Sequence, residues 1–348
     1  MKTKITALAL AALSATTAYA QKQVDGLDYY LPKTVVNVSV LVEKNTFKPG
    51  ELADFSDLYF KTSAATKPSV DYRIVGIRFS TAGIPDNEKK YTVAIDKKHS
   101  ILSIDCDRNG VLKAINDKAP DAPQAQPFVA ARKPAPLNPR DYMSQDILAA
   151  GNLPKMAQLV AQEIYDIRDS RNQLSRGEAD NMPKDGAQLK LMFANLDKQE
   201  RALMQMFTGV TTTDTLEHIV AFVPEKGKTD VTAFRFSKKF GLLTADDYSG
   251  APYDIVVEDE GVMTDLPEEA NAAKKEKDDF LLGVNTPGKI KLTVTADGRK
   301  VASFDTYAAQ FGKVEMLNGA LFGKKITSHL ILDPVTGSVV KLRTEPLE

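Results

Sequence analysis

The chain has almost no cysteine: Cys106 is the only one among 348 residues. A lone cysteine cannot form a disulfide within the chain, so packing must hold the fold together. Residues 103–107 alternate as a strand does, and Asp105 and Asp107 flank the thiol. Their negative charges oppose formation of the thiolate, the nucleophilic form of cysteine. We therefore interpret Cys106 as a small residue packed on a strand; a cross-link between two molecules is the alternative.

Histidine and tryptophan are also scarce, with three histidines and no tryptophan. His99, His218 and His329 lie far apart, and none has a second His or Cys at the spacing of a metal site. The chain also lacks a Gly-x-Ser-x-Gly elbow and a Gly-x-Gly-x-x-Gly fingerprint. The sequence therefore predicts no metal, no cofactor and no catalytic residue. The lack of tryptophan argues against glycan binding without excluding it, since eleven tyrosines remain.

Long apolar runs are missing as well, because no stretch reaches the ~18 residues of a membrane-spanning helix. Charge is nearly balanced, with 45 Lys and Arg against 46 Asp and Glu. A balance of this kind gives no indication of nucleic-acid binding. We expect no transmembrane segment in the mature chain.

The first twenty residues predict an export signal. Lys2 and Lys4 precede a short apolar run over residues 5–13, and residues 18–20 (Ala-Tyr-Ala) have the small side chains that signal peptidase accepts. The residue after the expected cut is Gln21 rather than cysteine, which argues against a lipoprotein. We expect an exported protein that is periplasmic, outer-membrane-associated or extracellular.

The strongest positive pattern is a pair of amphipathic helices between residues 153 and 209. Stripe residues recur at spacings of three and four, which places them on one face of each helix. The stripes comprise Leu153, Ala157, Val160, Ile164, Ile167, Arg171 and Leu174 in the first helix, and Leu189, Met192, Leu196, Gln199, Leu203 and Met206 in the second. Two such stripes joined by a short connection predict an antiparallel hairpin, each arm ~30 Å long.

The ends of these helices also have sequence signals. Gly177 and Gly209 are predicted C-caps, and Asp185 followed by Gln188 is typical of a helix start. Arg171 and Gln199 interrupt otherwise apolar stripes, so we expect them to fix the register or to reach solvent at the edge of the seam. Asp197 and Arg201 have the spacing of an ion pair along one helix.

Strand patterns lie on both sides of the hairpin. Before it, strands are predicted over residues 35–42, 72–79, 91–95, 101–104 and 111–115, with a short helix over 51–60. After it, they are predicted over residues 215–223, 231–236, 253–257, 289–295, 300–304, 326–332 and 339–343, with a surface segment over 268–279. Six prolines between residues 119 and 139 predict an extended strap, for which a peptide ligand of a partner is the alternative.

These patterns predict an α+β fold in which β-rich, sandwich-like regions flank an antiparallel two-helix hairpin. The predicted divisions are a signal peptide (1–20), an N-terminal β-rich domain (21–118), a Pro-rich linker (119–140), the helical hairpin (141–209) and a C-terminal β-rich domain (210–348).

Short stretches along most of the chain resemble an exported family of Bacteroidales known only as a domain of unknown function. The stretches are YLPKT (30–34), FKPG (47–50), IRDSR (167–171), GEAD (177–180), FRFS (234–237) and DPVTG (333–337). The resemblance implies a Gram-negative envelope location. It implies no activity, cofactor or catalytic residue.

The leading functional hypothesis is a non-enzymatic envelope protein that binds or scaffolds an envelope protein or a glycan. Polar residues at the predicted hairpin tip, Arg176, Glu178, Asp180 and Asn181, are the candidate contact surface. One alternative is an envelope hydrolase acting on glycan or peptide, with a site assembled from distant strands. Another is a purely structural part of a larger envelope assembly.

Overall fold

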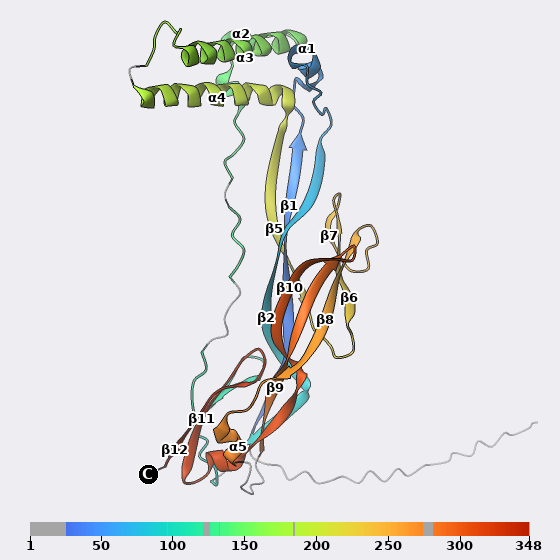
Figure 1. Cartoon of the computed structure of the whole chain (residues 1–348), viewed down its shortest axis with the longest axis vertical. Helices are drawn as coiled ribbons and strands as arrows, with labels where there is room; N and C mark the ends of the chain where they lie inside the picture. The colour runs from blue at the N-terminus through green and yellow to red at the C-terminus, as the bar shows by residue number, and fades with distance from the viewer. Residues whose placement is uncertain are drawn as a thin grey trace, which may run out of the picture.

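The computed structural model describes residues 26–95, 97–120, 126–131, 133–183, 185–273 and 281–347. Its fold is α+β, as predicted: three antiparallel sheets occupy most of an elongated molecule, and two long helices lie across one end (Figure 1). The predicted export signal lies outside the described residues, as does the charged run 274–279. Within the described part, no helix is both long enough and apolar enough to cross a membrane.

The first sheet has three strands in the order β2-β1-β5. They are β1 (Gly26–Lys48), β2 (Ser69–Ala94) and β5 (Val210–Phe222). The prediction of separate strands over 72–79 and 91–95 is wrong, because both belong to the single strand β2. The 23-residue strand β1 supplies a partner along β2. The register shifts between the pairs Tyr30–Lys90 and Pro32–Pro85, so residues 86–89 bulge opposite Leu31 while β2 continues.

The second sheet has five strands in the order β10-β9-β8-β6-β7. They are β6 (Asp230–Ser237), β7 (Gly241–Leu243), β8 (Ala251–Met263), β9 (Leu281–Ala296) and β10 (Arg299–Asn318). Alternate residues of β1, including Val36, Val38 and Val40, pack with Ile290 and Leu292 of β9 in one buried cluster. Two sheets that share a core in this way form a sandwich, as the predicted fold class requires.

The third sheet has four strands in the order β12-β11-β4-β3. They are β3 (Ile104–Cys106), β4 (Leu112–Ile115), β11 (Ile326–Leu332) and β12 (Val339–Pro346), and the short helix α5 (Glu268–Ala273) lies beside them (Figure 1). The turn between β3 and β4 contains Asn109 and Gly110, a pair typical of tight turns. The Asp107 carboxylate accepts hydrogen bonds from the N–H groups of Asn109 and Val111, each at 2.8 Å, and Gly110 has φ +81°.

Strands from before and after the helices share two of the three sheets. β5 pairs with β1, and β11 pairs with β4. The predicted ranges 21–118 and 210–348 therefore follow one another along the chain but interleave in space. A central strand such as β1 has backbone groups on both edges, and partners from both ranges satisfy them.

The helical end holds α3 (Leu153–Arg176) and α4 (Gly186–Thr208), which form the predicted hairpin. We call the end where α4 passes into β5 the base of the hairpin and the opposite end its tip. Shorter elements pack against the two helices: 3-10 helices over Ala53–Phe55 and Pro139–Tyr142, α1 (Ser56–Phe60) and α2 (Gln145–Leu148). The described residues of the Pro-rich segment before Pro139 have neither helix nor strand, and they run alongside the sheets toward the helices (Figure 1).

Candidate functional site

The helical hairpin begins and ends where its capping residues predict. The Asp185 side chain accepts a hydrogen bond from the Gln188 N–H at 2.7 Å, which satisfies one free amide at the start of α4. Gly177 ends α3 with φ +74°, and Gly209 ends α4 with φ +76°. A side chain at Gly209 would also meet Lys48 O at 2.5 Å, so this position requires glycine where the helix passes into β5.

The seam between the helices is apolar in its middle and toward the base. Val160, Ile164 and Leu203 are fully buried, and Leu196 is half-buried. Two predicted stripe residues differ: Leu153 is 45% exposed and Met192 is 37% exposed. Leu153 is the first residue of α3, at the base, and Met192 lies in the second turn of α4, toward the tip, so both lie at the ends of the seam.

Ion pairs join the helices along one side of the seam. Arg168 Nε lies 2.6 Å from Glu200 Oε1, and Arg171 Nη1 lies 2.9 Å from Asp197 Oδ1. Arg171 therefore has the register-fixing position that the sequence predicts. The predicted side-chain pair of Asp197 with Arg201 is wrong, because Arg201 Nε donates to the Asp197 carbonyl instead. The Asp197 carboxylate faces α3, where Arg171 offers a cation across the seam.

The base of the hairpin is fixed to the β sheets through the connection between β1 and β2. The Leu52 N–H donates to Met206 O at 2.7 Å, and the buried Ser56 hydroxyl donates to Phe207 O at 3.1 Å. The Tyr165 hydroxyl donates to the Tyr59 carbonyl at 2.6 Å. These bonds hold the end of α4 nearest the sheets and the middle of α3, and the opposite end of the hairpin projects from the molecule (Figure 1).

The structure brings the predicted contact residues together at the projecting end. All four are exposed: Arg176 is the last residue of α3, and Glu178, Asp180 and Asn181 lie in the short connection between the helices. Arg176 Nη1 lies 3.9 Å from Glu178 Oε2, an exposed pair of little energetic weight. Whether these residues contact a partner stays a prediction.

Apolar side chains near the tip were not part of the predicted surface. Met182 is 43% exposed and Leu191 is 62% exposed. Leu191 lies off the stripe by helical periodicity, which is the only sequence signal that it faces away from α3. Charged, amide and apolar groups thus lie close together at the end of the hairpin, a mixture typical of protein-binding surfaces.

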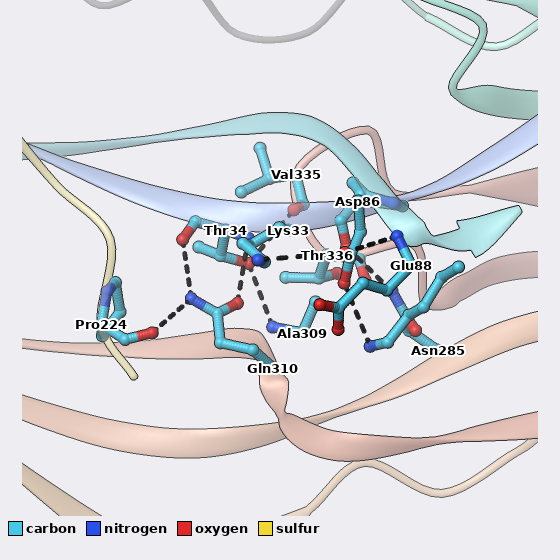
Figure 2. Close-up of polar contacts among 12 residues, drawn as sticks. Lys33, Thr34, Asp86, Glu88, Pro224, Asn285, Ala309, Gln310, Val335 and Thr336 are labelled. Atoms are coloured by element: carbon cyan, nitrogen blue, oxygen red, sulfur yellow. Dashed lines mark hydrogen bonds and ion pairs between the residues drawn. The ribbon is translucent and has the colours of Figure 1, made fainter. Parts of the chain in front are cut away.

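A second polar cluster is buried where β1, β10 and the loop before β12 meet. Thr34 is fully buried, and its hydroxyl donates to Val335 O and accepts from the Ala309 N–H. The Gln310 amide accepts from the Thr34 N–H and donates to the carbonyls of Thr34 and Pro224 (Figure 2). Gln310 lies where the pairing of β10 with β9 shifts register, which frees its side chain to bridge two other segments.

Asp86 contributes the one buried carboxylate of this cluster in the described part of the chain. It is 4% exposed, and Lys33 Nζ and Lys89 Nζ lie 3.9 and 3.8 Å from its oxygens (Figure 2). Desolvation lowers the pKa of Lys89, and the Asp86 charge partly offsets that effect. Asn285 donates to the carbonyls of Pro32 and Thr336 at 3.2 and 2.8 Å. We interpret the cluster as a joint between sheets, since its bonds mainly satisfy backbone groups.

The candidate catalytic and metal residues do not converge. His218 lies on β5, His329 lies on β11, and Cys106 lies on β3. Desolvation raises the pKa of the Cys106 thiol, and Asp105 and Asp107 raise it further. Among the described residues, no three His, Cys, Asp or Glu side chains gather closely enough to hold a metal ion.

A profile of one protein family matches residues 25–340, nearly the whole described chain. The chain belongs to that family, described as Domain of unknown function (DUF4831). No curated protein and no solved structure matches the chain. The DUF4831 match confirms the predicted resemblance to a family of unknown function, and it assigns no role to any residue.

Proposed function

We propose that the protein is a non-catalytic binding or scaffolding module of the cell envelope, with the hairpin tip as its contact surface. The observation that carries the proposal is the contrast between the two ends of the hairpin. Hydrogen bonds to Leu52 and Ser56 fix the end of α4 at the base, and one to Tyr59 holds the middle of α3, whereas the tip is exposed. A surface held on rigid elements loses little conformational freedom when it binds a partner.

Export and an envelope location are parts of the same proposal. The charged, apolar and small-residue regions of residues 1–20 support export, and Gln21 supports a chain without a lipid anchor. The partner would then be an envelope protein or a glycan. The hydrolase alternative has no particular arrangement of described residues in its favour, so we propose only the binding role.

Site-specific cross-linking in cells that make this protein tests the proposal. A photoreactive amino acid at Asn181 should give one discrete adduct, and the protein part of the adduct should begin at Gln21. Changing the other tip residues Arg176, Glu178 and Asp180 to alanine should reduce the adduct several-fold. The same changes should leave the thermal midpoint unaltered, because exposed side chains contribute little to stability.

A matched control uses exposed residues of the same kinds on the second sheet, Arg299 and Glu258, also changed to alanine. These variants should keep the full amount of adduct. Equal adduct from tip and control variants, or cross-linking that is no stronger at Asn181 than at Arg299, would contradict the proposed contact surface.

A further inference from the structure

Strand β5 lies at an edge of the first sheet, and its outer side has no backbone partner in the described part of the chain. β5 pairs with β1 alone, across Val210–Phe222. No other backbone hydrogen bond reaches these residues from described parts of the protein. In a strand, alternate N–H and C=O groups point to each side, so β5 presents a row of free donors and acceptors.

A groove follows this edge. Three neighbouring hollows, of about 710, 600 and 450 Å³, share lining residues and run from the base of α4 along the first half of β5. Consecutive residues 210–216 line one wall, so the edge of β5 borders the groove. Lys44, Thr46 and Lys48 of the neighbouring strand β1 also line it, so the groove extends from this edge over one face of the sheet. Residues 130–131 and 133–137 of the Pro-rich strap line the other wall.

The strap on the far side of the groove is attached through side chains, and its described residues form no backbone–backbone hydrogen bond with β5. The Phe128 N–H donates to Glu217 Oε2 at 3.2 Å, Arg78 lies over the Phe128 ring, and Lys133 Nζ lies 3.7 Å from Glu43 Oε1. The same Glu217 carboxylate also accepts the Ser39 hydroxyl, and these bonds lower its pKa. Between these two attachments and the helices, Pro134 and Pro136 have no N–H with which to pair with β5.

The chemistry of the walls indicates what fits between them. Among protein ligands, an extended backbone matches a row of alternating donors and acceptors along its whole length. Lys44 and Lys48 line the groove and have no ion-pair partner among the described residues, whereas the third lysine, Lys133, already pairs with Glu43. Two carboxylates, Glu51 and Asp214, also line the groove. We infer that residues 210–216 bind an extended peptide segment of a partner protein as an added β-strand, with acidic side chains on the peptide facing the lysines.

This site is separate from the hairpin tip and does not depend on the function proposed for the tip. The alternative is that the strap only shields an edge that would otherwise promote aggregation. The two roles differ in whether an added peptide can protect the amides of β5.

The test uses the full chain from Gln21 and a labelled, end-blocked hexapeptide of alternating Glu and Val as the probe. The probe should bind, and hydrogen exchange at residues 210–216 should slow when it is present. Two further versions have N-methyl groups on alternate residues, at odd or at even positions. Because only one set of peptide amides faces β5, one version should lose binding and the other should keep it.

Charge is tested separately with a probe in which Lys replaces Glu, and with the double variant Lys44→Glu, Lys48→Glu. Both changes should weaken binding about tenfold or more, as expected when close opposite charges become like charges. The control Lys190→Glu, Lys300→Glu changes the same charge at exposed sites outside the groove and should bind normally. Unchanged exchange at 210–216, or equal binding of both methylated probes, would overturn the inference and leave the strap as a cover.

Discussion

At the scale of single residues, buried polar groups join segments that are far apart in sequence. Tyr29 is fully buried; its hydroxyl donates to Gly283 O at 3.1 Å and accepts from the Gly283 N–H at 2.8 Å. Thr34 and Gln310 form a comparable bridge between β1 and β10. Each bridge satisfies backbone groups that have no ladder partner there, so losing one side chain leaves buried groups without bonds.

Tyr29→Phe should therefore lower the free energy of unfolding by about 1–3 kcal/mol, because both Gly283 groups lose their partner while the aromatic ring is kept. Urea unfolding followed by circular dichroism measures the loss. Tyr248→Phe is the matched control, since Tyr248 is 82% exposed and should change stability by less than about 0.5 kcal/mol. Equal stabilities of the two variants would contradict the bridging role of Tyr29.

Alkaline pH provides a second measurement on the same variant. Burial raises the pKa of Tyr29 above its usual value of 10.0. The unfolded chain therefore releases this proton first as pH rises, and the folded state loses stability above about pH 10. Tyr29→Phe should remove part of that alkaline loss, and Tyr248→Phe should not.

Residue-scale predictions from sequence succeeded where partners are close in the chain. Asp185 caps the helix three residues away, and Gly177 ends the helix that precedes it. The joint around Asp86, Asn285 and Gln310 was not predicted, because its partners lie on different strands and their pairing cannot be read from spacing. The register shifts near these side chains leave no local signature in the sequence beyond the weak strand signal of residues 80–90.

At the scale of elements, the two long helices form because each has an apolar stripe that the other covers. The 3.6-residue period predicted both helices to within a few residues, and the polar, Pro-containing connection predicted the turn. The long strands were predicted less well. β2 extends to Ser69–Ala94 because β1 offers a partner along its length, a tertiary influence that overrides local propensity.

Leu203→Ala should destabilise the helical end by about 2–5 kcal/mol, because it removes a fully buried side chain and leaves a cavity. Leu191→Ala is the same substitution on the same helix at a side chain that is 62% exposed. It should cost less than about 0.5 kcal/mol. Thermal unfolding monitored at 222 nm compares the two. A larger loss for Leu191→Ala would mean that α4 packs on α3 through a different face.

At the scale of the whole molecule, the interleaved sheets form a body that carries the hairpin at one end (Figure 1). β5 follows the hairpin directly and pairs with β1, so the C-terminal end of the helical unit is attached to the first sheet. The chain reaches the start of α3 from β4 of the third sheet. The order of the predicted regions was readable from sequence, whereas their interleaving was not. The pairing of β1 with β5, which also brings the Ser39 hydroxyl to the Glu217 side chain 178 residues away, has no local signal. The central claim is that the outer half of the hairpin is an appendage, available for binding and dispensable for folding.

Thermal unfolding of a chain whose residues 172–196 are replaced by a four-residue Gly-Asn loop tests this claim most directly. Leu174 is the only buried side chain among the described residues of that segment. We expect the shortened chain to keep its β-sheet spectrum and a midpoint within about 3 °C of the full chain. Loss of the cooperative β-sheet transition would instead show that the hairpin tip is part of the folding unit and would contradict the account.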